Sequence, residues 1–458
     1  MLIDMLRVRI EASSPGDKFV LIRFIQLHGV DKPVALSVQA LAKDVGVTNR
    51  VASTAIQRLV AQGVLVRQTI GAQLGRPSSS YTCVSEVLAE YLESGREVTQ
   101  ESIHEQCIVR LLDGVLSRAS DRLFYANRLL LAVLLAHADE FGVVGGLGLR
   151  DLSELTGLKK DVLKSRIQLL TEKGFIRVCV SGATASGLFR PMKSRYYLNL
   201  AHPFFARFHE GGVLVHATLV LTRQNEMSEV ERVYAFASAL KEGRGLDDSF
   251  DLVQFPYLQH AKRLVDWLSD PRARRFISTL QSKLDGCAAA MLSRRWSEIP
   301  DRVLIHDKGL IRRICREFRL RSGLTGLADR PKRRALIFLL LEAAHHRAMA
   351  IHSALVADFS GIPFNSLDFC ILPNPKRNLM RVGFKPGQIP ITVVLLAKSR
   401  RPSLFSGCHV ATRDQRMGRA VECFENEAEL PLKSRWLYGL SQPEELIESD
   451  KAQIDTFE

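Results

Sequence analysis

The hydrophobic and glycine positions of the first part of the chain occur twice in the same order, 111 residues apart. The two segments align without gaps over about thirty residues. The first segment contains Leu36, Leu41, Gly46, Val51, Ile56, Gln57, Leu59 and Gly63. The second contains Leu147, Leu152, Gly157, Val162, Ile167, Gln168, Leu170 and Gly174. Repetition of structural positions at one fixed distance predicts two copies of the same folding unit.

Each copy predicts a short helix, a tight turn and a longer helix. Glycine favours the position just after a helix, so Gly46 and Gly157 mark the turn. The inward face of the longer helix has residues at helical spacing: Ala52, Ile56 and Leu59 in the first copy, and Leu163, Ile167 and Leu170 in the second. An apolar helix over 19–27 or 124–138 precedes each copy and completes a three-helix core.

Strand patterns follow the longer helix of each copy, which ends at Gly63 or Gly174. The strand-like segments are 64–70 and 81–84 in the first copy, and 175–180 and 195–200 in the second. Each pair of segments is joined by a stretch rich in glycine, proline or serine. Each copy therefore predicts a hairpin with a loose tip.

This order of elements, present twice, resembles the bacterial winged-helix DNA-binding domains of the MarR-like and ROK-repressor kind. The resemblance covers residues 12–84 and 120–200. It is carried by Leu-x-x-x-x-Gly before the longer helix, Leu-x-x-x-Gly at its end, and Gly75-Arg76-Pro77 in the first hairpin. It implies two domains that bind double-stranded DNA sequence-specifically, each with a recognition helix in the major groove and a hairpin, the wing, beside it.

The polar face of each longer helix supplies the candidate DNA contacts. In the first copy these are Thr48, Asn49, Arg50, Ser53, Thr54 and Gln57. In the second copy they are Lys159, Lys160, Lys164, Ser165 and Gln168. Asparagine and glutamine form paired hydrogen bonds with adenine, and arginine with guanine, so the first helix is expected to read sequence. Lysine lacks the forked donors of arginine, so the second helix is expected mainly to anchor phosphates.

Basic residues also lie in the two predicted wings. Arg76 stands between a flexible glycine and a proline of fixed φ, which would present its guanidinium outward, towards a narrow minor groove. The second wing repeats this pattern with Arg190, Lys193 and Arg195. These four side chains are therefore predicted to contact DNA.

The other parts of the chain predict a helical linker over 85–119, a polar transition over 201–250 and a third domain over 251–458. In the third domain the patterns indicate helices near 258–268, 274–296, 303–320 and 331–359, and strands near 369–372, 380–384 and 391–396. The stretch from Glu422 onward is an acidic tail. The fold class predicted for the whole chain is mainly α, of the α+β type.

Composition and charge are those of a folded multidomain protein with an anionic partner. The 458 residues are 46% hydrophobic and 24% charged. The 63 basic residues exceed the 49 acidic ones, and the net charge of +14 favours a polyanion such as nucleic acid. The excess lies within 251–400, where there are 26 basic and 12 acidic residues.

The longest apolar runs, 129–136 and 336–341, are far shorter than the ~18 residues of a membrane span. Charged residues interrupt the beginning of the chain, so no secretory signal is expected. We therefore expect a cytoplasmic, nucleoid-associated protein that has no membrane partner.

Motifs of catalysis and of metal binding are missing from the sequence. The eight cysteines are scattered, without a C-x-x-C pair. Glu342, His345, His346 and His352 lack the second Glu-x-x-His of a diiron bundle. Neither a P-loop nor G-x-S-x-G occurs, and the glycines of 145–148 lack the third glycine of a dinucleotide loop. We expect no enzymatic activity, no cofactor and no metal.

These features favour a transcription regulator with two winged helices. Its C-terminal domain would mediate self-association, effector sensing or contact with RNA polymerase or a second regulator. A homodimer would engage up to four half-sites. Three alternatives stay open: a plasmid or mobile-element replication initiator that binds directly repeated origin sequences, an enzyme that winged helices direct to DNA, and winged helices that serve protein contacts.

Overall fold

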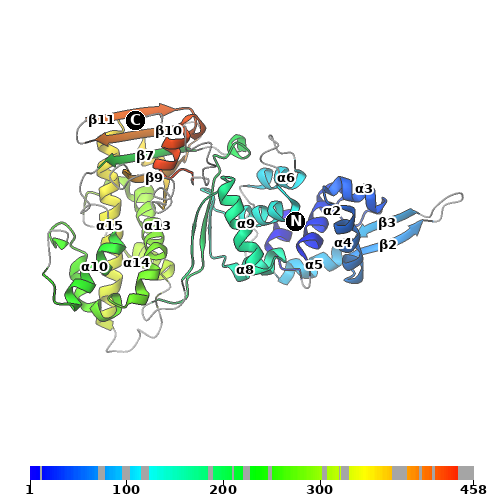
Figure 1. Ribbon diagram of the computed structural model, residues 1–458, viewed down its shortest axis with the longest axis horizontal. Helices are drawn as coiled ribbons and strands as arrows, with labels where there is room; N and C mark the ends of the chain where they lie inside the picture. Colours follow the sequence, from blue (N-terminus) through cyan, green and yellow to red (C-terminus); the bar gives the residue numbers. More distant parts are fainter. Residues whose placement is uncertain are drawn as a thin grey trace, which may run out of the picture. The chain divides into compact units, whose positions relative to one another are not determined.

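The computed structural model describes residues 1–10, 13–70, 78–94, 104–114, 123–183, 189–208, 211–219, 227–245, 250–301, 307–318, 320, 330–373, 389–401, 405–414 and 418–441. The chain divides into two compact units. Unit 1 comprises Met1–Ile176 and Leu198–Phe208, and unit 2 comprises Arg177–Tyr197 and His209–Glu458. Both units contain helices and strands (Figure 1), so the protein is a mixed α and β structure, compatible with the α+β class.

Two repeats with the same order of elements make up most of unit 1, although residues 177–197 of the second hairpin belong to unit 2. Repeat 1 consists of α2 (Pro15–His28), β1 (Val34–Ala35), α3 (Val38–Val45), α4 (Asn49–Ala61), β2 (Leu65–Ile70) and β3 (Ser78–Cys83). Repeat 2 consists of α7 (Tyr125–Ala136), β4 (Val143–Gly145), α8 (Leu149–Thr156), α9 (Lys160–Glu172), β5 (Ile176–Val180) and β6 (Arg195–Leu198). The helices outside the repeats are α1 (Leu2–Arg7), α5 (Ser85–Ser94) and α6 (Glu105–Asp113).

Local chemistry explains where the helices of the repeats begin and end. At the start of α2, the Ser14 hydroxyl accepts from the backbone N–H of Asp17, and the Asp17 carboxylate accepts from the N–H of Ser14 at 2.7 Å. Helix α3 ends at Gly46, with φ 77°, and α8 ends at Gly157, with φ 71°. This left-handed conformation favours glycine, which has no Cβ.

The core of unit 1 follows the predicted periodicity. Helices α2 and α7 are each buried along most of their length. All six inward positions predicted for the longer helices are buried: Ala52, Ile56, Leu59, Leu163, Ile167 and Leu170. The small sheets have the orders β1-β3-β2 and β4-β6-β5. Strands β2 and β3 are antiparallel, from Leu65 opposite Cys83 to Ile70 opposite Ser78.

Unit 2 places long helices against a five-stranded sheet. Its helices are α10 (Glu229–Lys241), α11 (Leu258–Ala261), α12 (Val265–Leu268), α13 (Ile277–Arg295), α14 (Lys308–Glu317), α15 (Arg330–Asp358) and α16 (Leu432–Leu437). Its strands are β7 (Gly212–Leu219), β8 (Leu367–Leu372), β9 (Ile391–Ser399), β10 (Gly407–Asp414) and β11 (Gly418–Phe424). The sheet order is β11-β10-β7-β9-β8, in which β7 and β10 are parallel and the other pairs antiparallel (Figure 1).

The expectation of a polar transition over 201–250 is corrected by two regular elements in this segment. It contains α10 and β7, and β7 is the central strand of the sheet. The apolar run Val213 to Val215 is buried, and strands pair with β7 on both sides. The predicted strand over 380–384 and the end of the acidic tail lie outside the described residues.

The second hairpin also differs from its prediction as an exposed wing. Phe189 and Met192 lie between its strands in the sequence, and both side chains are buried in the hydrophobic core of unit 2. The Phe189 and Phe318 ring centroids are 6.2 Å apart. At the base of the hairpin, Arg177 is buried and bonds to Glu427 at 2.8 Å. Residues 177–197 of this hairpin therefore belong to unit 2 and are held there by apolar side chains of the expected loop.

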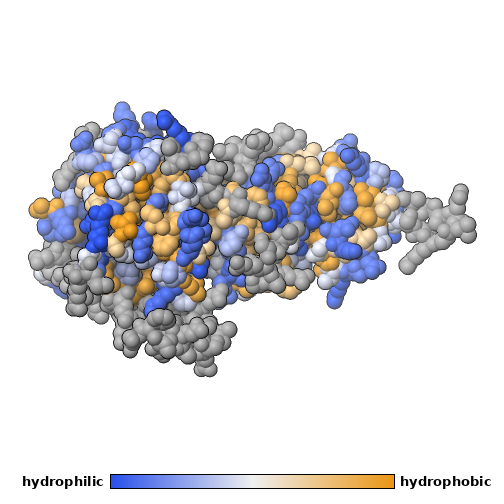
Figure 2. All heavy atoms as spheres, turned by 90° about the horizontal axis from the view of Figure 1, so that it is seen from above, coloured by the Kyte–Doolittle hydropathy of each residue, from blue (hydrophilic) through white to orange (hydrophobic). Residues whose placement is uncertain are grey.

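The described surface has a mixed character. Figure 2 shows hydrophilic and hydrophobic residues interspersed over the face that is seen. Among the exposed large hydrophobic residues are Phe124 (78% exposed) and Val253 (86%). In the part of the chain that the structure describes, no helix is both long enough and apolar enough to span a bilayer.

Candidate nucleic-acid interface

Helix α4 of repeat 1 has one buried and one exposed face. Ala52, Ala55, Ile56 and Leu59 are buried. Of the six predicted contacts, five are exposed and one is partly exposed. The exposed residues are Thr48, Asn49, Arg50, Thr54 and Gln57, and the partly exposed one is Ser53. Helix α4 thus presents the predicted residues together on the surface, next to the turn at Gly46.

One of these residues also has a structural role. Thr48 is the N-cap of α4, and its hydroxyl accepts from the backbone N–H of Val51 at 3.4 Å. Its hydroxyl proton can still donate to a phosphate. The amide of Asn49 and the guanidinium of Arg50 lie in the first turn, where a recognition helix meets base edges.

Helix α9 of repeat 2 also exposes its predicted contacts: Lys159, Lys160, Lys164, Ser165 and Gln168. Several of them already bond within the helix. The Ser165 hydroxyl donates to the carbonyl of Val162 at 3.0 Å. The Gln168 amide donates to Glu172 at 2.8 Å. Lys164 lies 4.0 Å from Asp161. The polar groups of α9 are therefore more engaged with one another than those predicted on α4.

Sequence reasoning passed over Asp161. This residue is 111 positions after Arg50, so it is the counterpart of Arg50 in repeat 2. Its side chain is 98% exposed. An exposed carboxylate accepts hydrogen bonds, and in the major groove the matching donor is the amino group of cytosine. The alignment of the two repeats is the signal that could have identified this position.

The longer helix of each repeat, α4 or α9, is tied to the first helix of its own repeat. In repeat 1, Arg58 of α4 lies 3.3 Å from the buried carboxylate of Asp17 in α2. In repeat 2, Arg166 of α9 donates to the buried amide oxygen of Asn127 in α7 at 2.6 Å. These polar contacts fix the orientation of α4 and α9 on their repeats.

The two hairpins that were expected to form wings differ in the basic residues that they expose. Arg76 lies outside the described residues. The described part of the first hairpin exposes Arg67, whose Nε donates to the Ser79 hydroxyl at 3.1 Å. Arg67 is a further basic residue that sequence reasoning missed. Strand alternation gives no signal for it, because Arg67 shares a face of β2 with the buried Leu65, while Val66 is exposed as well.

The second hairpin requires a correction. Arg190 and Lys193 are exposed, but on a segment that packs into unit 2. Arg195 is only 20% exposed, and its guanidinium bonds to the carbonyl of Ser282 at 3.0 Å and to Glu317 at 3.3 Å. Because these acceptors in unit 2 hold the guanidinium, the prediction that Arg195 contacts DNA from a free wing is wrong.

The two repeats are joined by two buried cations. The Lys18 ammonium of α2 donates to three carbonyls: Leu6 at 3.3 Å, Val8 at 2.6 Å and Leu155 of α8 at 2.7 Å. The Arg128 guanidinium of α7 donates to Leu112 at 3.0 Å and to Gly46, after α3, at 3.2 Å. Burial lowers the pKa of Lys18 to about 7.

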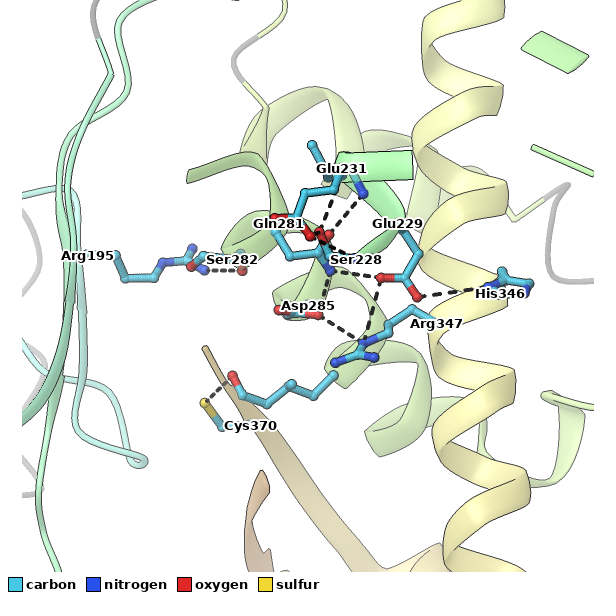
Figure 3. A network of polar contacts seen from close by, with 12 residues as sticks. Arg195, Ser228, Glu229, Glu231, Gln281, Ser282, Asp285, His346, Arg347 and Cys370 are labelled. Atoms are coloured by element: carbon cyan, nitrogen blue, oxygen red, sulfur yellow. Dashed lines mark hydrogen bonds and ion pairs between the residues drawn. The ribbon is translucent and has the colours of Figure 1, made fainter. Parts of the chain in front are cut away.

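Unit 2 contains a buried polar network around Arg347 of α15 (Figure 3). Arg347 lies 3.2 Å from Asp285 of α13 and 4.0 Å from Glu229 of α10. Burial raises the pKa of Asp285 to about 6, although Arg347 opposes this shift. Burial also acts to raise the pKa of Glu229, but Arg347 and His346 outweigh it and hold that pKa at about 2. The network joins three helices through one shared guanidinium.

A small cavity lies beside this network. It is lined mainly by apolar side chains, with Glu229 at its wall, and has a volume of about 20 Å³. This volume holds about one water molecule. An effector molecule does not fit into it.

A second polar cluster surrounds Asp358, the buried last residue of α15. Its carboxylate lies 2.6 Å from His216 Nδ1 and accepts from Arg413 Nε at 2.9 Å. His216 Nε2 lies 3.0 Å from the Thr218 hydroxyl. Burial lowers the pKa of His216, although Asp358 opposes this. Asp358 lies at a helix C-terminus, where the helix dipole disfavours a carboxylate, and the neighbouring Arg413 offsets this effect. A carboxylate, an imidazole and a hydroxyl in this order are also the groups that activate nucleophiles in enzymes.

The residues considered for a metal site have separate partners. His345 bonds to the carbonyl of Ile299 at 3.0 Å, and Glu342 pairs with His260 at 3.0 Å. The His352 ring lies 4.5 Å from the Trp296 ring, tilted by 43°. Among the described residues, no three histidine, cysteine or acidic side chains are grouped as metal ligands.

Comparison with known proteins adds no relative: no family model matches this chain, and no curated protein matches it.

Proposed function

We propose that this protein is a sequence-specific regulator that binds double-stranded DNA through two winged helices in unit 1. The observation that carries the proposal is the outward face of α4. Asn49, Arg50 and Gln57 are exposed on a helix whose opposite face is buried, directly after a glycine turn. Amide and guanidinium groups in this position match the hydrogen-bonding edges of adenine and guanine.

The charges at the start of α9 support the same proposal. Lys159 and Lys160 occupy the N-cap and the first position of the helix, and both are exposed. The helix dipole disfavours cations at this end. Lysines placed against the dipole are explained by an anionic partner, and phosphate groups of DNA supply that charge.

In this proposal the two repeats have different tasks. Repeat 1 reads base edges with its forked donors, and repeat 2 mainly anchors the backbone with its lysines. Unit 2 serves self-association, effector sensing or contact with RNA polymerase or a second regulator. The homodimer expected from the sequence belongs to this proposal too.

The first experiment needs no assumption about the target. Purified protein is incubated with fragmented genomic DNA of its host, and the retained fragments are sequenced. We expect enrichment at one or a few promoters. Enrichment at direct repeats in a replication origin would instead identify an initiator, and retention no better than that of random fragments would overturn the proposal.

A variant pair makes this experiment specific to α4. The double variant Asn49→Ala and Arg50→Ala should lose the enrichment while keeping its helical content by circular dichroism. The matched control is Arg150→Ala, because Arg150 is 80% exposed on α8 and pairs only locally, with Glu154 at 3.0 Å. Equal loss in both variants would show that general charge, and not α4, causes the retention.

A further inference from the structure

The contacts that join the two repeats are reciprocal. Lys18 lies 28 residues before Gly46, and Arg128 lies 29 residues before Gly157, so they occupy nearly equivalent positions. Lys18 of repeat 1 bonds to Leu155, at the end of α8 in repeat 2. Arg128 of repeat 2 bonds to Gly46, just after α3 in repeat 1. Each cation thus reaches the C-terminal end of the other repeat's short helix.

The turn glycines repeat this reciprocity. A Cβ at Gly157 would lie 2.5 Å from the carbonyl oxygen of Ser13, just before α2. A Cβ at Gly46 would lie 3.2 Å from the guanidinium of Arg128 in α7. The turn of each repeat therefore packs against the first helix of the other, with no space for a side chain at Gly157 and a tight contact with Arg128 at Gly46.

Where the first helices meet, the contact is apolar and aromatic. The rings of Phe19 in α2 and Tyr125 in α7 have centroids 5.7 Å apart. Arg128 also lies over the Phe19 ring, at 4.9 Å. Lys18 is 1% exposed and Arg128 is 6% exposed, so both cations are removed from water within the interface. A buried cation that loses its acceptors is costly, which opposes separation of the repeats.

In this interface the first helix of each repeat contacts the turn of the other repeat. Such reciprocal contacts are typical of two partners that are related by a two-fold axis. We propose that the repeats form an approximate two-fold pair within one chain, and that this pair reads an imperfect inverted repeat of fixed spacing in double-stranded DNA. This inference rests on the proposed function and specifies its substrate. Half-sites related by a two-fold axis in DNA mirror a two-fold axis in the protein that binds them.

The two repeats differ in their exposed residues, so the two half-sites of the proposed DNA site also differ in sequence. Asn49 and Arg50 of repeat 1 correspond to Lys160 and Asp161 of repeat 2. The half-site bound by repeat 1 is therefore more stringent in sequence than the half-site bound by repeat 2. One chain suffices for both half-sites, because both recognition helices belong to unit 1.

The test begins with the full chain and a library of random DNA duplexes. Bound duplexes are selected, amplified and sequenced through several rounds. We expect one stringent and one relaxed element in inverted orientation at a single spacing. Elements in direct orientation, or at several spacings, would overturn the two-fold reading while leaving the proposed function intact. Failure to select any motif would overturn the proposed function and this inference together.

Insertions into the selected site then test whether the pair is rigid. Five added base pairs turn the half-sites to opposite faces of the duplex, and ten restore the face but lengthen the distance. A locked pair loses at least tenfold in affinity with both insertions, down to that of a single half-site. If affinity recovers when ten base pairs are inserted, the two repeats are joined flexibly, and this result would overturn the rigid arrangement of the pair.

Stoichiometry and one variant complete the test. With the selected duplex in excess, mass photometry should find one bound duplex for each chain, also when the protein is a homodimer. One duplex for every two chains would assign the inversion to the homodimer and overturn the inference. Arg128→Ala should widen the tolerated spacing while keeping affinity for a single half-site within about twofold. Arg150→Ala, exposed on the same repeat, should keep the wild-type spacing. The insertion series uses the wild-type chain, so it decides the question even if Arg128→Ala does not fold.

Discussion

Repeats 1 and 2 share most of their inward residues and differ at most of their outward ones. Ile56 and Ile167 are both buried at the same position of the longer helix. On the outside, Thr48 gives way to Lys159 and Arg50 to Asp161. Packing restricts an inward position to side chains of suitable size, while an outward position is restricted only by what it contacts. The pattern of buried residues therefore indicates the fold that the repeats share. The differences between their exposed residues are the basis for proposing different DNA contacts for each repeat.

The difference also affects how each helix begins. Thr48 caps α4 with its hydroxyl, whereas Lys159 makes no side-chain cap for α9. A lysine at this position gives up the stabilisation of a cap, typically about 1 kcal/mol. Helix α9 therefore lacks this cap and carries lysines, whereas α4 has none.

The largest expected effect is that of salt on the repeat rich in lysine. Raising the salt concentration from 50 to 200 mM should weaken DNA binding about a thousandfold if six or more phosphates are neutralised. Replacing Lys159, Lys160 and Lys164 by alanine should lower the slope of log K against log salt by about three. Fluorescence anisotropy at several salt concentrations measures this slope, and an unchanged slope would refute phosphate anchoring by repeat 2.

The next effect tests base reading by repeat 1. Arg50→Ala should cost about 1–3 kcal/mol of binding free energy on the selected site and relax the preference at one base pair. Affinities for the site and for all its single-base variants measure both quantities. Wild-type affinity in Arg50→Ala would mean that α4 is not the reading helix.

A pH dependence distinguishes the two cations that join the repeats. Arginine stays charged, but the pKa of Lys18 is lowered by burial from 10.5 to about 7 in the folded protein. Between these values the unfolded chain binds one more proton than the folded chain, so the free energy of unfolding rises with pH.

Lys18→Met removes this titration. Relative to Lys18→Met, the wild type should gain about 1 kcal/mol per pH unit above pH 7. Urea unfolding of both proteins from pH 6 to 9, followed by circular dichroism, measures the difference. Parallel curves would show that the three carbonyl acceptors keep Lys18 protonated throughout this range.

The smallest effect comes from a single phosphate contact. Lys164→Ala should weaken binding severalfold, equally for the selected site and for unrelated duplexes. Its matched comparison is Arg50→Ala, which should affect the selected site far more. A loss of discrimination in Lys164→Ala would assign sequence reading to repeat 2 as well.

The sequence predicts unit 1 better than unit 2 for physical reasons. Repetition identifies the helices and the turns at Gly46 and Gly157, since their contacts are local. The central strand β7 pairs with β10, almost two hundred residues later, and no local pattern indicates such a partner. The lengths and apolar faces of α13 and α15 were predictable, but their assembly with this sheet was not.

The candidate interface was predictable to a similar degree. Exposed residues of α4 and α9 follow from helical period, and the structure places all eleven on the surface or near it. Burial of Lys18 and Arg128 does not follow from the sequence, because such side chains are rarely buried. The contact of Arg195 with Glu317 was also missed, because Glu317 lies in a distant part of the chain.

The second hairpin has a consequence for how this protein can be divided. Phe189 and Met192 belong to the core of unit 2 although repeat 2 precedes them in the chain. A fragment that ends at residue 200 would carry these apolar side chains into water and would tend to aggregate. Repeat 2 is therefore not an interchangeable module, and recombination that replaced the C-terminal half would have to replace this hairpin with it.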